Sequence, residues 1–252
     1  MIDSIVLVGD SIRLSYQPYV AVRVRSTVVW GPADNCRSSR YLLENLDNLV
    51  LGRLHDTSLV HFNAGAHDIM RTPDNGFGLE VGLDEYRRNL ALILARLRAE
   101  PLVADVIVAT TAPVVDSRHQ AQGTFMRHNA DVVAYNHVLK AAGEAAGFRV
   151  NDLYGALRAC PFDPISEDGI HLNETGKEYA IFARRPTLEG EEQILLDENE
   201  AAQGHSYYRA GGFAISQDNH LMAFAEDTVG RNQYKLRIKD LRTGAMLPDS
   251  VD

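Results

Sequence analysis

Cysteines and long apolar runs are scarce in this sequence. Cys36 and Cys160 are the only two cysteines among 252 residues, and they form neither a CxxC pair nor a zinc-ligand spacing. This argues against a disulfide scaffold and against a structural metal site. No basic segment and no long apolar stretch accompanies the first apolar run, which argues against a signal peptide or a membrane span. We therefore expect a cytoplasmic protein without a membrane partner.

Basic residues are fewer than acidic residues in this sequence. The chain has 25 Lys and Arg against 34 Asp and Glu, which gives a formal net charge of -9. Binding to nucleic acid depends on clustered Lys and Arg that release counterions, so we expect no nucleic-acid partner. The chain is otherwise ordinary for a globular protein, with 45% hydrophobic and 23% charged residues. Its length suits an α/β domain with a smaller module.

Short apolar runs alternate with amphipathic segments up to about residue 173. The runs are typical of buried strands and the segments of helices, because their apolar residues recur at helical spacing. Strands that alternate with helices predict βαβ units and a parallel sheet covered on both faces. The expected strands are 5–8, 27–30, 58–62, 106–109 and 148–150, and the expected helices are 41–54, 83–97 and 132–142.

The pattern changes after residue 173. Short alternating runs separated by turn residues predict an antiparallel meander there. A change of this kind near the end of an α/β chain indicates a second module of different origin. The expected strands of this module are 178–184, 193–196, 213–216, 221–225, 234–238 and 245–247.

A single serine stands where the first predicted strand ends, in Gly9-Asp10-Ser11. The carboxyl edge of a parallel sheet is where such folds place their chemistry. A serine nucleophile needs a general base and a group that orients the base. Among the nine histidines, only His171 has a carboxylate, Asp168, three residues away in a turn-rich segment. Taken alone, Gly-Asp-Ser also fits a simple helix-capping turn.

Four blocks in order resemble the SGNH (GDSL-type) hydrolase family over residues 1 to about 173. They are Gly9-Asp10-Ser11, residues 63–68 (NAGAHD), residues 127–152 and residues 168–173 (DGIHLN). The resemblance implies a three-layer α/β/α, flavodoxin-like fold with a parallel sheet. It also implies a carboxylic ester hydrolase that acts on a small ester without a cofactor or a metal.

The same resemblance assigns roles to individual residues. Ser11 would be the nucleophile, His171 the general base, and Asp168 the group that holds the imidazole. An oxyanion hole would use the backbone N–H groups of Ser11 and Arg37 and the side chain of His67.

Two of these oxyanion donors depart from the family pattern. Arg37 stands where glycine is usual, so its side chain needs room and a permissible φ. His67 replaces an asparagine, and a neutral imidazole still has one N–H to donate. Alternatively, His67 is only a hydrogen-bonded polar residue beneath the edge of the sheet. Asn63 is then the fallback donor to the oxyanion.

Residues 174 to 252 resemble the first propeller blades of oligopeptidase B, a serine peptidase of the prolyl oligopeptidase family. The match covers only the non-catalytic propeller portion, so it implies no peptidase residues. The chain therefore resembles a chimera of an SGNH domain (1–173) and a propeller fragment (174–252).

A propeller blade is protected by its neighbours, and its edges are safe only inside the ring. We expect this fragment to expose apolar side chains and to drive homo-oligomerisation, unless it folds back onto the α/β domain or stays mobile. The side chains expected to be exposed are Phe213, Ile215, Met222 and Phe224.

These observations predict a serine esterase that hydrolyses short-chain acyl esters through an acyl-enzyme intermediate. Two alternatives remain at this point. One is a carbohydrate O-deacetylase. The other is a weakly active or inactive fusion whose tail mediates self-association.

Overall fold

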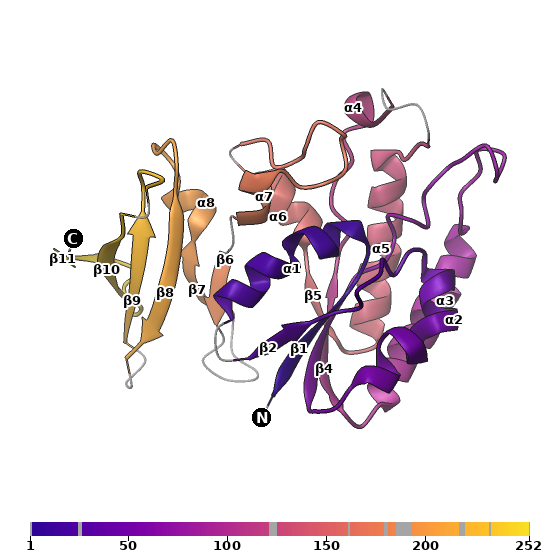
Figure 1. Ribbon diagram of the computed structural model, residues 1–252, viewed down its shortest axis with the longest axis horizontal. Coiled ribbons are helices and arrows are strands. Elements are labelled where there is room, and N and C mark those ends of the chain that lie inside the picture. Colours follow the sequence, from indigo (N-terminus) through magenta and orange to yellow (C-terminus); the bar gives the residue numbers. More distant parts are fainter. Residues whose placement is uncertain are drawn as a thin grey trace. The chain divides into compact units, whose positions relative to one another are not determined.

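A computed structural model describes residues 2–24, 27–120, 125–160, 162–178, 181–184, 193–216, 220–231 and 233–251. The chain divides into two compact units, Met1–Gly176 and Lys177–Asp252, shown in Figure 1. Among the described residues, no helix has both the length and the apolar character needed to cross a bilayer.

The first unit is built on a five-stranded parallel sheet with the strand order β2-β1-β3-β4-β5. This is the flavodoxin-like order, in which the direction of strand addition across the sheet reverses between β1 and β3. The predicted fold class is confirmed, and each strand lies where an apolar run predicts it. The strands are β1 (Ser4–Val8), β2 (Val28–Trp30), β3 (Ser58–Phe62), β4 (Val103–Ala109) and β5 (Arg149–Asn151).

Helices cover both faces of this sheet. Helix α1 lies on one face, and α2, α3 and α5 lie side by side on the other (Figure 1). The predicted helix 41–54 is divided, because α2 ends at Leu49 and a 3-10 turn, η1 (Leu51–Arg53), follows. The helices are α1 (Ser11–Arg23), α2 (Ser39–Leu49), α3 (Leu83–Ala99), α4 (Asp116–Gln120), α5 (Asn129–Ala145), α6 (Leu153–Ala159) and α7 (Glu174–Glu178).

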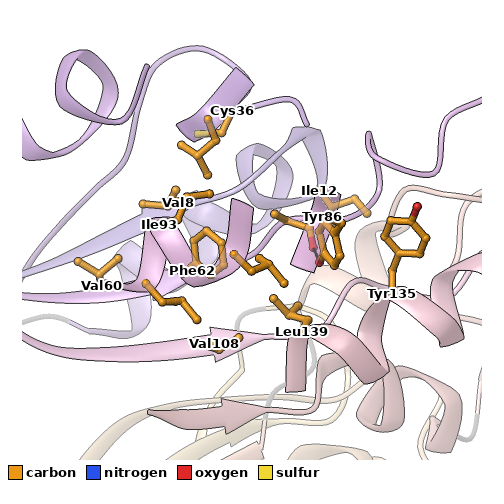
Figure 2. Packing of buried hydrophobic residues seen from close by; sticks show 14 of the residues in the cluster. Val8, Ile12, Cys36, Val60, Phe62, Tyr86, Ile93, Val108, Tyr135 and Leu139 are labelled. Carbon is orange, nitrogen blue, oxygen red and sulfur yellow. Dashed lines mark hydrogen bonds between the residues drawn. The ribbon is translucent and has the colours of Figure 1, made fainter. Parts of the chain in front are cut away.

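The core of the first unit lies between the sheet and these helices. Figure 2 shows side chains of the strands, such as Phe62 and Val108, against Ile93 of α3 and Leu139 of α5. These four side chains are completely buried, and each contributes roughly 1.5–3 kcal/mol by leaving water. This rigid base positions the loops at the carboxyl ends of the strands.

The second unit is antiparallel, as predicted. A four-stranded sheet has the order β11-β10-β9-β8, and a separate pair joins β6 to β7. Its elements are β6 (Ile181–Arg184), β7 (Gln193–Asp197), α8 (Glu198–Ala201), β8 (Arg209–Ile215), β9 (Leu221–Asp227), β10 (Lys235–Asp240) and β11 (Met246–Val251).

The second unit also has a small core of its own, which corrects part of the expected exposure. Met222 and Phe224 are completely buried, because they cluster with Leu196 of β7 and with Tyr208. Ile215 keeps 39% of its surface exposed. The side chain of Phe213 lies outside the described residues.

Candidate active site

Ser11 is held at the junction of β1 and α1. Asp10 has an extended backbone and caps the helix, since its carboxylate accepts the N–H of Ile12 at 2.9 Å. This cap makes Ser11 the first residue of α1, and its own N–H has no acceptor among the described residues. A free N–H at a helix N-terminus favours negative charge nearby.

His171 and Asp168 lie close to Ser11 in space, although they come near the end of the first unit in sequence. His171 Nε2 lies 2.8 Å from Ser11 Oγ, and His171 Nδ1 lies 2.5 Å from Asp168 Oδ2. The structure thus brings together the three residues that the sequence pairs across 160 positions. The arrangement has the order nucleophile, base and orienting carboxylate.

A tight turn between Asp168 and His171 makes this geometry possible. Gly169 has a φ of +77°, and a Cβ there would lie 2.7 Å from the backbone of both Val115 and His119. Glycine meets both demands because it has no side chain. The turn folds the Asp168 carboxylate back onto the ring three residues later.

The hydrogen bonds around Asp168 keep its carboxylate ionised. Its Oδ1 accepts hydrogen bonds from Ser166 Oγ at 2.6 Å and from the N–H groups of Ile170 and His171. Burial opposes ionisation, but the hydrogen bonds from His171, Ser166 and the backbone outweigh it and hold the pKa of Asp168 well below its usual range. A charged carboxylate can keep the proton on Nδ1 of His171, which leaves Nε2 free to accept the serine proton.

The three side chains open into a pocket of about 450 Å³. Such a volume lies at the small end of the range for ligand sites. His67, the predicted side-chain donor of the oxyanion hole, also lines this pocket, and so do residues of the segments that follow β2, β3 and β4. The walls are formed by Asp10, Ser11, Ile12, Asn35, Ala66, His67, Met70, His119, Phe125, Arg127, Asp168, Ile170 and His171.

Arg37 is not among the lining residues. Its backbone has a φ of +53°, the left-handed conformation that explains why glycine is usual at this position. Its N–H donates to the side-chain oxygen of Asn35 at 2.7 Å. The structure therefore does not offer the Arg37 N–H to the pocket, contrary to the expected role, because a neighbouring side chain accepts it.

Asn35 instead links this loop to His67. The Nδ2 of Asn35 lies 3.2 Å from Nε2 of His67. The orientation of the Asn35 amide is fixed because its Oδ1 accepts the N–H of Arg37. Burial lowers the pKa of His67, so the ring is neutral at neutral pH. Since Nε2 accepts from Asn35, the single proton belongs on Nδ1.

The fallback donor, Asn63, is occupied elsewhere. Its amide donates to the carbonyl of Ala109 at 2.8 Å, and Thr111 Oγ1 lies 3.4 Å from the same nitrogen. Asn63 is buried and joins the ends of β3 and β4. It does not line the pocket.

Three polar residues of the pocket were not predicted as site residues from the sequence: Asn35, His119 and Arg127. Asn35 lies in the loop after β2, whereas His119 of α4 and Arg127 both lie in the connection between β4 and α5. Arg127 lies within a block that resembles the family, but the resemblance gave it no role. In the described part of the chain, no group of three or more His, Cys, Asp or Glu could hold a metal ion.

Comparison with known protein families gives two matches. The model of the "GDSL-like Lipase/Acylhydrolase family" matches residues 7–179. The model of "Prolyl oligopeptidase, N-terminal beta-propeller domain" matches residues 170–252. Both resemblances seen in the sequence are therefore confirmed.

Solved structures of similar fold agree with the first match. A lipase/acylhydrolase from Enterococcus faecalis superposes with a TM-score of 0.54 at 22% identity, covering 70% of this chain and 90% of that one. The acetyl xylan esterase AlAXEase gives 0.55 at 16% identity, covering 69% and 93%. At these identities the likeness shows the fold.

Curated relatives agree with the second match. Dipeptidyl aminopeptidase BI of Pseudoxanthomonas mexicana is 43% identical over 93 residues, which are 31% of this chain and 13% of that protein. Protease 2 of Moraxella lacunata is 31% identical over 84 residues, which are 31% of this chain and 12% of that protein. The chain thus spans only about one eighth of the length of these two relatives.

The acylhydrolase match covers most of the chain, and the fold of the first unit agrees with it. The expected enzyme class, a carboxylic ester hydrolase, follows from this match. The chain belongs to the GDSL-like lipase/acylhydrolase family.

Proposed function

We propose that this protein hydrolyses short-chain acyl esters through an acyl-enzyme intermediate on Ser11. The observation that supports this proposal is the continuous hydrogen-bonded chain from Ser11 through His171 to Asp168, with distances of 2.8 and 2.5 Å. All three side chains line one pocket. Each group has the partner that its role requires.

The reaction follows from this arrangement. Ser11 Oγ attacks the ester carbonyl while its proton passes to Nε2 of His171, and the carbonyl oxygen becomes an oxyanion. The C–O bond to the alcohol then breaks, and His171 gives its proton to the departing alcohol. Water attacks the acyl-enzyme by the same route, so that the carboxylic acid leaves and Ser11 regains its proton.

The oxyanion would be met by two donors. One is the N–H of Ser11, which has no acceptor among the described residues and lies at the start of α1. The other is the Nδ1–H of His67, in the tautomer that the contact with Asn35 requires. Removing one donor of this kind typically costs about 10²–10³ in rate. Arg37 would act indirectly, because its N–H holds Asn35 in place.

A matched pair of serine variants tests the proposal. Ser11→Ala should lower the hydrolysis of 4-nitrophenyl acetate by about 10⁴-fold or more. Ser15→Ala, one turn further along α1, should leave the rate within about twofold, since Ser15 only donates to the carbonyl of Ile12. Equal rates for wild type and Ser11→Ala would contradict the proposal. That result would favour an inactive fusion whose tail mediates self-association.

A carbohydrate O-deacetylase is the second candidate. It is favoured by the similarity in fold to AlAXEase, an acetyl xylan esterase. Release of acetate from acetylated xylo-oligosaccharides, compared with simple acetate esters of equal reactivity, separates the two. A kcat/KM at least tenfold higher on the sugar would favour the deacetylase.

A further inference from the structure

We infer that the ester substrate carries a carboxylate, which Arg127 binds inside the catalytic pocket. This inference rests on the proposed function and names the class of substrate for the same site. It would separate the protein from esterases whose pockets select only by size.

Arg127 is a buried cation on the wall of the pocket. Only 5% of its surface is exposed, although an arginine is rarely buried without a partner. The short segment before α5 places it there, because Met126 forms an isolated antiparallel bridge with Arg71 through two backbone hydrogen bonds of 2.9 Å.

The contacts of Arg127 use only part of its guanidinium. Its Nε–H donates to the carbonyl of Ala66, and Nη2 lies 3.5 Å from the sulfur of Met70. The plane of the group stacks on Phe125, 4.9 Å from the ring centre. Nη1 has no hydrogen-bond partner among the described residues, so the outer edge of the fork is available to a ligand. A carboxylate matches that edge, because its two oxygens accept parallel N–H groups.

The charge of Arg127 is also uncompensated at close range. No carboxylate oxygen of the described residues lies within ion-pair distance of it. Burial lowers the pKa of Arg127 to about 10, and the more distant charges of Asp10 and Asp168 act against that change. The group therefore stays protonated at neutral pH. Asp168 already serves His171 at 2.5 Å, so it does not neutralise Arg127 directly.

Asp10 does not replace the missing anion. One of its oxygens accepts the N–H of Ile12, and the other is buried without a partner among the described residues. A buried cation without a paired anion is costly. A substrate carboxylate would supply this anion. An ester without a carboxylate would leave Arg127 unpaired, so the pocket should discriminate strongly against such esters.

Two ester pairs test this inference and locate the carboxylate. The first pair compares 4-nitrophenyl hydrogen glutarate with 4-nitrophenyl pentanoate, which places the charge on the acyl side. The second compares 4-acetoxybenzoate with 4-acetoxybenzamide, which places it on the alcohol side. Each kcat/KM is divided by the uncatalysed hydrolysis rate of the same ester, so that intrinsic reactivity cancels.

In wild type we expect one of the two anionic esters to be preferred by about 10- to 100-fold over its neutral partner. Arg127→Gln should bring that preference close to one, and Arg127→Lys should keep part of it. Arg71→Gln is the matched control, because Arg71 lies nearby but is paired with Asp131 at 2.8 Å. It should leave the preference unchanged.

Three results would overturn the inference. One is the absence of an anionic preference in wild type for both pairs. Another is an equal loss of preference in Arg127→Gln and Arg71→Gln, which would indicate a general field. The third is an equal fall of all four esters in Arg127→Gln, which would make Arg127 only a support for the Ala66 loop. In each case activity that still depends on Ser11 would leave the proposed function intact.

Discussion

The backbone of Arg37 adopts the left-handed region, with a φ of +53°. A side chain in that region costs roughly 1–2 kcal/mol, because its Cβ approaches the following carbonyl. The guanidinium recovers part of this by stacking over Tyr41, 4.7 Å from the ring centre. The residue thus keeps the conformation that glycine would adopt, although its side chain opposes it.

Two substitutions of Arg37 separate these contributions. Arg37→Ala removes the stacking and keeps the Cβ, whereas Arg37→Gly removes both. We therefore expect the glycine variant to be more stable than the alanine variant by about 1 kcal/mol. Urea unfolding of both variants measures the difference. An alanine variant as stable as the glycine variant would show that the conformation carries no strain.

The tautomer of His171 depends on Asp168. In Asp168→Asn the new amide can donate to Nδ1 of His171, which moves the ring proton to Nε2 and removes the base for Ser11. We expect kcat to fall by about 10³–10⁴-fold with little change in folding. Asp163→Asn is the control, since that carboxylate lies in the same loop but pairs with Arg118. Comparable losses in both variants would contradict a specific role for Asp168.

At the scale of single elements, helix α2 begins on a buried carboxylate. Asp68 is completely buried and accepts the N–H of Ser39 at 3.0 Å and its hydroxyl at 2.5 Å. Burial raises the pKa of Asp68 to about 6, even though these hydrogen bonds oppose the rise. The folded state therefore holds a proton that the unfolded state has already released near pH 4.

This difference predicts how stability depends on pH. Because the folded-state pKa is the higher one, the contribution of Asp68 is fully present below about pH 4 and is lost as the pH rises through 6. The neutral variant Asp68→Asn lacks this titration. Its free energy of unfolding relative to wild type should rise by roughly 1–3 kcal/mol between pH 4 and pH 7.5. Parallel pH profiles for the two proteins would refute the raised pKa.

The elements themselves could largely be predicted from the sequence. All five strands of the first unit and helices α2, α3 and α5 follow apolar runs and helical spacing. Helix α1 was not predicted, because it contains Pro18, and a proline normally ends a helical pattern in a sequence. Helix α5 begins at Asn129 and not, as predicted, at residue 132. The carboxylate of Asp116 accepts the N–H of Asn129 at 2.9 Å.

A pairing between site residues could be predicted most directly where both residues lie in one short segment. Asp168 and His171 are three residues apart, so their pairing could be inferred from a turn. Asn35 and Arg127 approach the pocket from separate loops, and only the folded chain brings them together. The Asn35 side chain accepts the N–H of Arg37 two residues later, a local contact that asparagine commonly forms in turns.

At the scale of the whole molecule, the second unit has one buried and one partly exposed sheet face. Met222 and Phe224 pack into its core. On the opposite face Leu236 is 39% exposed and pairs with Ala225, while Ile238 pairs with Ala223. An apolar face of this kind in a propeller blade normally meets another blade.

We expect this face to mediate homo-oligomerisation of the chain. Leu236→Glu should shift the full-length protein toward a monomer in light scattering after size exclusion. Val229→Glu is the matched control, because Val229 is 56% exposed in the connection between β9 and β10, outside the strands. A wild-type protein that is monomeric at all concentrations would contradict the expectation.

In the proposed reaction, Ser11 becomes covalently modified with the help of His171. Labelling with a fluorophosphonate tests it directly, since the serine oxygen displaces fluoride from phosphorus and the adduct is stable to mass spectrometry. We expect a single adduct on the peptide that contains Ser11, formed at least 10³-fold more slowly in His171→Ala. Labelling at another residue, or labelling of Ser11 at the same rate without His171, would contradict it.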